Sequence, residues 1–442
     1  MLKLQGQFSI ETFQSALQAT LEYHPLLTSS VTETKGQFHW QNADTMPMIV
    51  RQPLEERRFP ASKGIDLRHE PALTITVCNE NTDPAAVQLE GQTNIIFEVH
   101  HSACDAAGIV RFAEDLLCNY AHQCGFIDTQ KECAEPDLLL RRGKFGKPRN
   151  SIWRTLPKQF WGIFRAWTFL MNKVVPLTPA PQTRTNCRQG FVVRNVNHED
   201  TKNTKKKPLK LSAEYPAILY RDLTLAETQD VQQKAKRLGI TINDLFLCST
   251  FQAMKNITEK TSGHLRIAVP TNLRTPADVR MPAANIVSMV FLDRKSEKIQ
   301  PMESFYHGVH REMQHIKRCN LGWAFIHGLT VYRRIFGSFR KMMQPDRCWA
   351  TATVSNLGRL FADVSLPKRE GRVQIDESLE LVGIEASPPI RPQTAIGVCA
   401  MTYADRMTIN LHYDSNVLTD AEAQSILDDI TLTIQSLLEQ AA

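Results

Sequence analysis

The sequence lacks the features that mark secreted and membrane-spanning proteins. Its ten cysteines include no CxxC pair and follow no regular spacing, so we expect reduced thiols in a cytoplasmic protein and not a disulfide framework. The first residues, MLKLQG, contain no signal-peptide core, and export is therefore not expected. No uncharged apolar run approaches the roughly 20 residues that a membrane span needs, so the sequence predicts no transmembrane helix.

Acidic residues are missing from one long window of the chain. Between Asp137 and Glu199 there are twelve arginines and lysines and no aspartate or glutamate. This imbalance favours an anionic partner, such as lipid headgroups, an acidic carrier protein or a nucleotide phosphate, although a solvated basic surface explains it equally well. Apolar residues in the window recur at helical spacing, which fits either a core helix or an interfacial helix that lies on a membrane. These residues are Phe160, Phe164, Trp167, Met171 and Val174.

The order of predicted elements indicates two halves of one kind. At 442 residues the chain exceeds one ordinary core, and its composition, 42% hydrophobic and 22% charged, is that of a soluble globular protein. Capping boxes predict helices that begin after Thr224 and Thr419. Alternating strands and helices predict a duplicated α/β protein, with an N-terminal half at 1–180, a linker at 181–216 and a C-terminal half at 217–442. Strands are expected at 37–40, 72–78, 95–99, 265–269, 286–292, 350–354, 396–403 and 407–413.

The most informative run is HHSACDAAG at residues 100–108, between a predicted strand and the apolar face of a predicted helix. It sets His100 and His101 at a strand end, with Asp105 four residues after the second histidine. Strand ends and the loops after them carry chemistry in α/β proteins, and a histidine held by a carboxylate is the simplest general base near neutral pH. Two adjacent histidines are about as often surface or core residues, so the motif alone leaves both interpretations open.

Short segments along the chain resemble the chloramphenicol-acetyltransferase-like superfamily of CoA- and carrier-dependent acyltransferases. The similarity is greatest to stand-alone condensation-type proteins of secondary metabolism, such as those of nonribosomal peptide and polyketide-ester synthesis. His100, His101 and Asp105 match the HHxxxD signature of this family. Weaker landmarks occur in the family's order and together span nearly the whole chain. They are YHPLL at 23–27, IDL at 65–67 with PAL at 71–73, GITIND at 239–244, VPTNLR at 269–274 with Asn285, SNLG at 355–358, and YD at 413–414.

The resemblance implies a fold and a reaction. The fold is α/β, with two chloramphenicol-acetyltransferase-like domains in a V-shaped pseudo-dimer and a tunnel along their interface. The implied reaction moves an acyl group from acyl-CoA, or from a phosphopantetheine-carried thioester on an acyl-carrier protein, to a hydroxyl or amine. His101 would act as the general base, and no cofactor would be permanently bound. Proximity in the tunnel and donors aimed at the oxyanion would supply the rate.

The same resemblance assigns supporting residues. Asp105 would pair with an arginine, which we expect to be Arg274 in a bidentate contact that lysine does not replace. We expect His100 and Gly108 to support the loop. Ser355 and Asn356 are expected near the developing oxyanion.

One departure from the family pattern opens an alternative. Ala106 stands where the family usually has glycine, so a tight turn is expected to differ there. This departure, together with the acid-free basic window, favours an alternative function as a non-catalytic, condensation-like binding module for acyl-carrier proteins. No GGxS carrier attachment site is present, and any carrier is therefore expected to be a separate protein.

Two other chemistries fit less of the sequence. His100 and Asp105 also satisfy the H-x4-D spacing of glycerolipid acyltransferases, but the phosphate-contacting motifs of that family are absent. A metal site would need a third convergent ligand that the sequence does not reveal, and we expect no metal.

Aromatic and aliphatic residues gather with arginines around residues 161–167 and from Trp323 to Met343. These segments could guide a lipid acyl chain or touch a membrane surface, and core packing explains the same composition. We expect a small-molecule acceptor, with an acyl-carrier protein and a peripheral membrane contact as further candidate partners. The lysine run at 205–207 lies in a polar stretch, so no nucleic-acid partner is expected.

Overall fold

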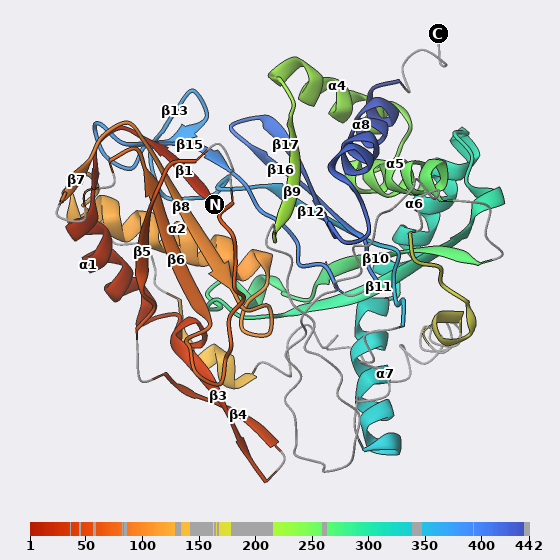
Figure 1. Cartoon of the computed structure of the whole chain (residues 1–442), viewed down its shortest axis with the longest axis horizontal. Helices are drawn as coiled ribbons and strands as arrows, with labels where there is room; N and C mark the ends of the chain where they lie inside the picture. The colour runs from red at the N-terminus through yellow and green to blue at the C-terminus, as the bar shows by residue number, and fades with distance from the viewer. Residues whose placement is uncertain are drawn as a thin grey trace.

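The structure is a computed structural model of the chain, and it describes most of the two halves. The described residues are 1–35, 37–43, 46–55, 59–81, 83, 86–128, 134–141, 162, 165, 168–177, 215–258, 263–337, 347–391 and 393–436. Two lobes lie side by side, each built on one large sheet, which confirms the predicted α/β class (Figure 1). Residues 181–214 of the expected linker, and Phe160, Phe164 and Trp167 of the apolar stripe, lie outside the described residues. The division of the chain at 180 and 216 stays a prediction.

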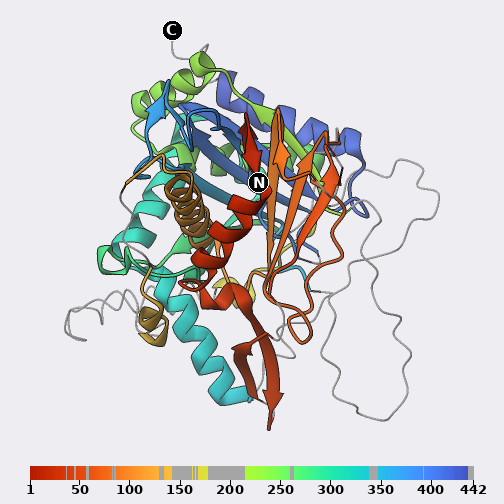
Figure 2. The same ribbon diagram turned by 90° about the vertical axis from the view of Figure 1, so that its left-hand side faces the viewer.

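The first lobe has a five-stranded sheet with strand order β15-β1-β8-β6-β5. Helices α1 (Ile10–Leu21) and α2 (Ala106–Gln123) share one core with this sheet and pack beside each other (Figure 2). The buried side chains of α1 recur at helical spacing, as its periodicity predicts. The strands are β1 (Leu2–Gln5), β5 (Ile49–Pro53), β6 (Leu73–Asn79), β8 (Gln92–Val99) and β15 (Glu380–Ile384).

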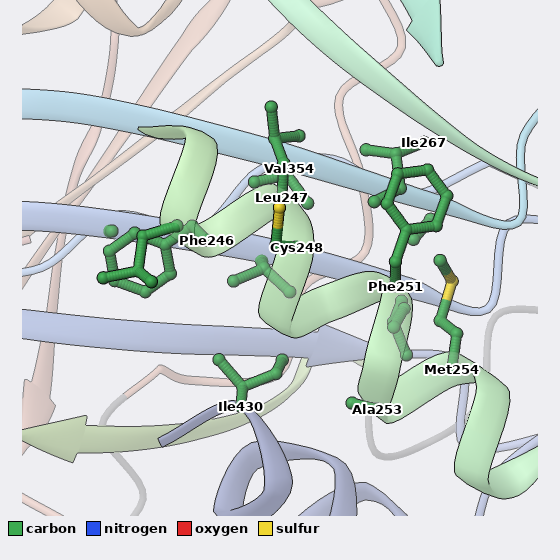
Figure 3. Close-up of a cluster of buried hydrophobic side chains, with 14 of the residues drawn as sticks. Phe246, Leu247, Cys248, Phe251, Ala253, Met254, Ile267, Val354 and Ile430 are labelled. Atoms are coloured by element: carbon green, nitrogen blue, oxygen red, sulfur yellow. The ribbon is translucent and has the colours of Figure 1, made fainter. Parts of the chain in front are cut away.

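The second lobe has a six-stranded sheet with strand order β11-β10-β12-β16-β17-β9. Helix α5 (Ile242–Ile257) is buried without a break from Asp244 to Met254, and its Phe251 packs near Ile267 of the sheet (Figure 3). The strands are β9 (Ala217–Asp222), β10 (His264–Asn272), β11 (Val287–Lys295), β12 (Ala352–Arg359), β16 (Ile396–Tyr403) and β17 (Arg406–Tyr413). The other helices are α4 (Leu225–Arg237), α6 (Glu303–Arg318), α7 (Leu321–Phe336) and α8 (Asp420–Ser436).

Local signals place the helix starts where the sequence predicts them. Thr224 accepts a hydrogen bond from the Glu227 amide (3.2 Å), and the Glu227 carboxylate accepts one from the Thr224 amide (2.7 Å). Thr419 and Glu422 form the same reciprocal pair before α8. Each box satisfies backbone donors that the first helical turn leaves unpaired. Within the described ranges, no helix combines the length and apolar composition that crossing a bilayer requires.

Smaller elements decorate the lobes. Two-stranded sheets pair β2 (Phe8–Ser9) with β7 (Gln88–Leu89) and β13 (Lys368–Arg369) with β14 (Arg372–Val373). A third, the hairpin of β3 (Ser29–Thr34) and β4 (Gln37–Asn42), projects from the first lobe (Figure 1). Four short 3-10 helices are described, at Pro25–Thr28, Pro136–Arg141, Pro276–Asp278 and Ser296–Lys298.

The second half contributes one strand to the sheet of the first lobe. After β12 the chain leaves the second sheet, adds β15 to the first sheet beside β1, and returns as β16. Parallel neighbours such as β12 and β16 need a long crossover, and here the crossover completes the other lobe. Phe361, Val373 and Leu381 from this crossover belong to the core of the first lobe. The sheet and the core of the first lobe are therefore complete only with residues from the second half of the chain.

A glycine tests this interdependence. Gly6 has φ +128°, and a Cβ there would lie 1.8 Å from the Ser378 carbonyl oxygen just before β15. We expect Gly6→Ala to lower the free energy of unfolding by about 3 kcal/mol or more, because backbone atoms must move apart. Gly125→Ala is the matched control, since Gly125 also has a positive φ (+71°) but nothing within 4 Å. It should cost only about 1 kcal/mol in urea unfolding, and equal losses for the two variants would contradict the packing described.

Candidate active site

The two histidines follow the central strand of the first lobe. Strand β8 lies between β1 and β6, and Ile95 and Phe97 anchor it in the core. Beyond Val99 the chain turns, with the His100 amide donating to the Ala72 carbonyl (2.9 Å). The His100 ring is half-buried, with Nδ1 2.8 Å from the Ser102 hydroxyl. Burial and the neighbouring His101 lower the pKa of His100, so this ring is neutral at pH 7.

The geometry at His101 selects one tautomer of its ring. Nδ1 lies 3.2 Å from the Cys104 carbonyl oxygen, which only accepts hydrogen bonds, so Nδ1 carries the proton. Nε2 then keeps its lone pair, and no hydrogen bond to it occurs in the described part of the chain. The His101 residue is exposed, and its carbonyl oxygen accepts from Nδ2 of Asn285 in the second lobe (2.6 Å). The exposed residue His101, with a lone pair on Nε2, therefore lies where the lobes meet.

The carboxylate of Asp105 is buried and joins the lobes. It caps α2, with Oδ1 accepting from the Gly108 amide (2.8 Å). Oδ2 accepts from Nη1 of Arg274 (2.9 Å) and from the Ile286 amide (2.7 Å), both in the second lobe. The predicted Asp105–Arg274 ion pair is therefore present. It is not the bidentate pair expected, because Nη2 of Arg274 donates to the Ala284 carbonyl instead (2.8 Å).

Helix α2 approaches the second lobe closely because residue 108 is glycine. A Cβ at Gly108 would lie 2.9 Å from the backbone nitrogen and oxygen of Ala284 and 2.7 Å from Sγ of Cys104. Ala106 is the first helical residue and has no positive φ, so its side chain is accommodated without strain. The alanine at position 106 therefore does not disrupt the turn at the start of α2.

His24 forms a second tie between the lobes, which the sequence alone does not predict. His24 is fully buried, and its Nδ1 accepts from the Ala283 amide of the second lobe (2.9 Å). Its Nε2 therefore carries the proton and faces Oδ2 of Asp115 on α2 at 3.2 Å. Arg111 donates to the same oxygen (2.8 Å) and also to the Val279 carbonyl (3.1 Å). His24 belongs to the YHPLL landmark, but only the folded chain brings it to a loop 259 positions away.

Burial sets the protonation states of this tie. Desolvation lowers the pKa of His24, more than the neighbouring Asp115 raises it. Burial alone would raise the pKa of Asp115, but hydrogen bonds from His24 and Arg111 hold it below its ordinary value. The tie therefore consists of a neutral imidazole and an Arg111–Asp115 ion pair at neutral pH.

Ser355 and Asn356 lie on β12, which runs parallel to β10. Both strands end at the same edge of the sheet, and Arg274 follows two residues after the end of β10. The Asn356 side chain accepts from the Gly358 amide (2.9 Å) in a local turn. Neither residue is hydrogen-bonded to His101 in the described ranges, so their place near an oxyanion, like the interface tunnel, stays a prediction. Within these ranges, no three histidine, cysteine or acidic side chains gather as metal ligands.

Known proteins resemble this chain in structure but not in sequence. No protein-family model and no curated protein sequence matches it. The first condensation domain of the calcium-dependent antibiotic synthetase, in complex with a substrate analogue, aligns with TM-score 0.66 and 12% identity over 100% of this chain and 91% of that chain. The starter condensation domain of rhizomide synthetase, in complex with C8-CoA and Leu-SNAC, aligns with TM-score 0.64 and 13% identity over 98% and 87%.

An epimerization domain of tyrocidine synthetase B is also similar, with TM-score 0.63 and 13% identity over 99% of this chain and 91% of that chain. The chain therefore has the two-lobed, chloramphenicol-acetyltransferase-like fold of condensation and epimerization domains, as its short motifs predict. Identities of 12–13% establish this fold and leave the reaction open.

The two contacts of the Arg274 guanidinium, with Asp105 and with the Ala284 carbonyl, lead to a stability prediction. Arg274→Lys should lower the free energy of unfolding by about 1.5–3 kcal/mol, because one ammonium cannot hold both the buried carboxylate and the Ala284 carbonyl in the same geometry. Arg359→Lys is the control, since the exposed Arg359–Asp405 pair should contribute less than about 1 kcal/mol. Urea unfolding measures both, and an equal, small loss would contradict the importance of the Asp105 contacts.

The lowered pKa of His24 leads to a pH prediction. The unfolded chain takes up a proton near pH 6.5, whereas the folded chain resists it, so the free energy of unfolding should fall as pH drops below about 6.5. The loss from this residue approaches about 1.4 kcal/mol per pH unit. His24→Asn should flatten the pH dependence of urea midpoints between pH 7 and 5, and the exposed His39→Asn should not. Parallel profiles for wild type and His24→Asn would show that the buried imidazole is not the titrating group.

Proposed function

We propose that the protein is an acyltransferase that moves an acyl group from a thioester to a hydroxyl or amine, with His101 as the general base. The observation that carries this proposal is the fixed tautomer of His101, whose Nδ1 proton faces the Cys104 carbonyl and whose Nε2 keeps its lone pair. The exposed ring lies on a loop clamped between two lobes of the condensation-domain fold. Such a nitrogen can accept a proton from an acceptor group within hydrogen-bond distance.

The reaction balances without a covalent enzyme intermediate. Nε2 of His101 takes the proton of the acceptor O–H or N–H as that atom bonds to the thioester carbonyl carbon. The carbonyl oxygen becomes an oxyanion, for which we propose Ser355 and Asn356 as nearby groups. The C–S bond then breaks, and the imidazolium returns its proton to the departing thiolate. The products are an ester or amide and a free thiol.

The remaining site residues act as positioning groups in this proposal. Asp105 has hydrogen-bond donors on both carboxylate oxygens, which supports a role in holding the loop and not in moving protons. Arg274 and Gly108 secure the contact of α2 with the second lobe. His100 is neutral and bonded to Ser102, which suits a structural role beside His101. Correct placement of a general base contributes as much as its basicity.

The proposed substrates need no resident cofactor. The thioester would arrive as acyl-CoA or on the phosphopantetheine arm of a separate acyl-carrier protein. The rhizomide starter condensation domain is described in complex with C8-CoA and Leu-SNAC, which makes acyl-CoA a reasonable first donor to assay. A non-catalytic carrier-binding module is the alternative. Of its two motives, the alanine at 106 causes no strain at the start of α2, and most of the acid-free basic window lies outside the described residues.

Turnover assays test the proposal. The full chain is incubated with acyl-CoA and acyl-carrier donors and a panel of alcohols and amines, and free thiol release is followed. For an accepted pair, His101→Ala should lower kcat about 10²–10⁴-fold, because the general base is removed. His39→Ala, at an exposed histidine on β4, should leave kcat unchanged.

Three results would contradict acyl transfer by this mechanism. If His101→Ala leaves turnover intact, His101 is not the general base. Salt-sensitive binding of acyl-carrier proteins with no turnover of any donor would favour the binding module. A product of inverted configuration with no acyl transfer would favour an epimerase.

A further inference from the structure

Two elements project from the same end of the molecule. In Figures 1 and 2 helix α7 and the β3–β4 hairpin both extend downward, away from the end that carries α4 and α8. The first half of α7 packs on the body, with Phe325 5.4 Å from the Phe291 ring and 6.1 Å from the Phe169 ring. Core packing therefore explains the aromatic residues at the start of α7, and the last turns need another explanation.

The last two turns of α7 expose apolar side chains. Val331 is 52% exposed and Ile335 is 67% exposed, although neither has a polar atom in its side chain. A helix in water usually turns its apolar residues toward a core, and clustered exposed apolar residues mark interaction sites. At the tip of the hairpin Phe38 is 58% exposed, and it pairs with Glu33 beside the turn. Apolar tips on two protruding elements are unlike a groove for one partner helix.

Charge identifies the kind of partner. From residue 313 to residue 345 the sequence has no aspartate or glutamate, and Arg333 and Arg334 are exposed in the last turn of α7. The segment that packs on α7 through Phe169 lies in the second acid-free window, between Asp137 and Glu199. At its end Leu170 and Met171 are 52% and 64% exposed. The described part of this window therefore places exposed aliphatic side chains next to Phe169, which contacts α7, and α7 itself supplies the exposed arginines.

We propose that the end of the molecule formed by α7 and the β3–β4 hairpin docks on an anionic lipid surface. Val331, Ile335 and Phe38 would enter the boundary between headgroups and acyl chains, and Arg333 and Arg334 would contact lipid phosphates. On α7 the exposed aliphatic side chains lie beside two exposed arginines, and the sequence from 313 to 345 has no acidic residue. This order of apolar and cationic groups fits a lipid surface, where acyl chains lie beneath anionic headgroups. At the hairpin Glu33 stands opposite Phe38, so α7 supplies the positive charge of the docking end. The contact is peripheral and does not depend on the proposed acyl transfer.

Vesicle flotation tests the docking surface without any substrate. The full chain is mixed with vesicles of phosphatidylcholine alone or with added phosphatidylglycerol, at low and at high salt. We expect co-flotation with the anionic vesicles, weakened by salt and by loss of the anionic lipid. The double variant V331D/I335D should lower the vesicle partition coefficient tenfold or more. Arg333→Gln and Arg334→Gln should each lower it roughly fivefold.

A variant on another helix controls for the effect of placing an acidic residue at an exposed apolar position. Leu432 is 59% exposed on α8, a helix at the opposite end of the molecule from α7 (Figure 1), so Leu432→Asp should leave flotation unchanged. Because all substituted side chains are exposed, each variant should keep the unfolding temperature of the wild type, and thermal unfolding verifies this. Absence of co-flotation of the wild type with either vesicle would overturn the proposal, as would equal losses in V331D/I335D and Leu432→Asp.

Two other occupants give distinct results. If a purified acyl-carrier protein binds the wild type, loses binding in V331D/I335D, and vesicles do not bind, the surface is a carrier dock and the lipid proposal is wrong. If size-exclusion chromatography gives a dimer that V331D/I335D converts to a monomer, again without vesicle binding, α7 is an interface between copies. Acyl transfer to a water-soluble acceptor should be equal in wild type and V331D/I335D, which separates this proposal from the proposed reaction.

Discussion

The buried carboxylate of Asp105 is the interaction on which the junction of the lobes depends. It ends the histidine loop, caps α2 and accepts hydrogen bonds from Arg274 and the Ile286 amide of the other lobe. A hydrogen bond to a charged group contributes about 1.5–3 kcal/mol to stability, and an unpaired buried charge costs more. Loss of one donor therefore also destabilises the buried carboxylate and the contacts of its other donors. Because the loop and the cap are continuous in sequence, this contact also fixes the backbone that carries His101.

Two further ties limit how the lobes can move against each other. His24 joins α2 to the loop before β11 through a neutral imidazole, and β15 of the second half pairs with β1 in the first sheet. With contacts on the helix side and on the sheet side, the lobes cannot slide without breaking buried hydrogen bonds. A general base needs such constraint, since an imidazole displaced by about 1 Å loses much of its effect.

Much of this architecture follows from local sequence patterns. The capping residues Thr224 and Thr419 mark helix starts because side-chain and backbone groups three residues apart satisfy each other. The family motifs predict the Asp105–Arg274 pair, and the structure contains it. The pair is not bidentate, because Nη1 of Arg274 donates to Asp105 and Nη2 donates to the Ala284 carbonyl. The tie at His24 and the pairing of β15 with β1 join residues far apart in sequence, so no local periodicity predicts them. Ala106 illustrates the same limit, because its effect depends on whether the position needs a positive φ.

The tautomer of His101 tests the central claim most directly. Side-chain nitrogen NMR of the histidine-labelled protein, with His101→Gln used for assignment, distinguishes a protonated Nδ1 from a protonated Nε2. The account predicts a proton on Nδ1 and a bare Nε2 in the neutral ring, as the Cys104 carbonyl requires. A proton held on Nε2 would contradict it, because that nitrogen could not accept a proton from an incoming nucleophile.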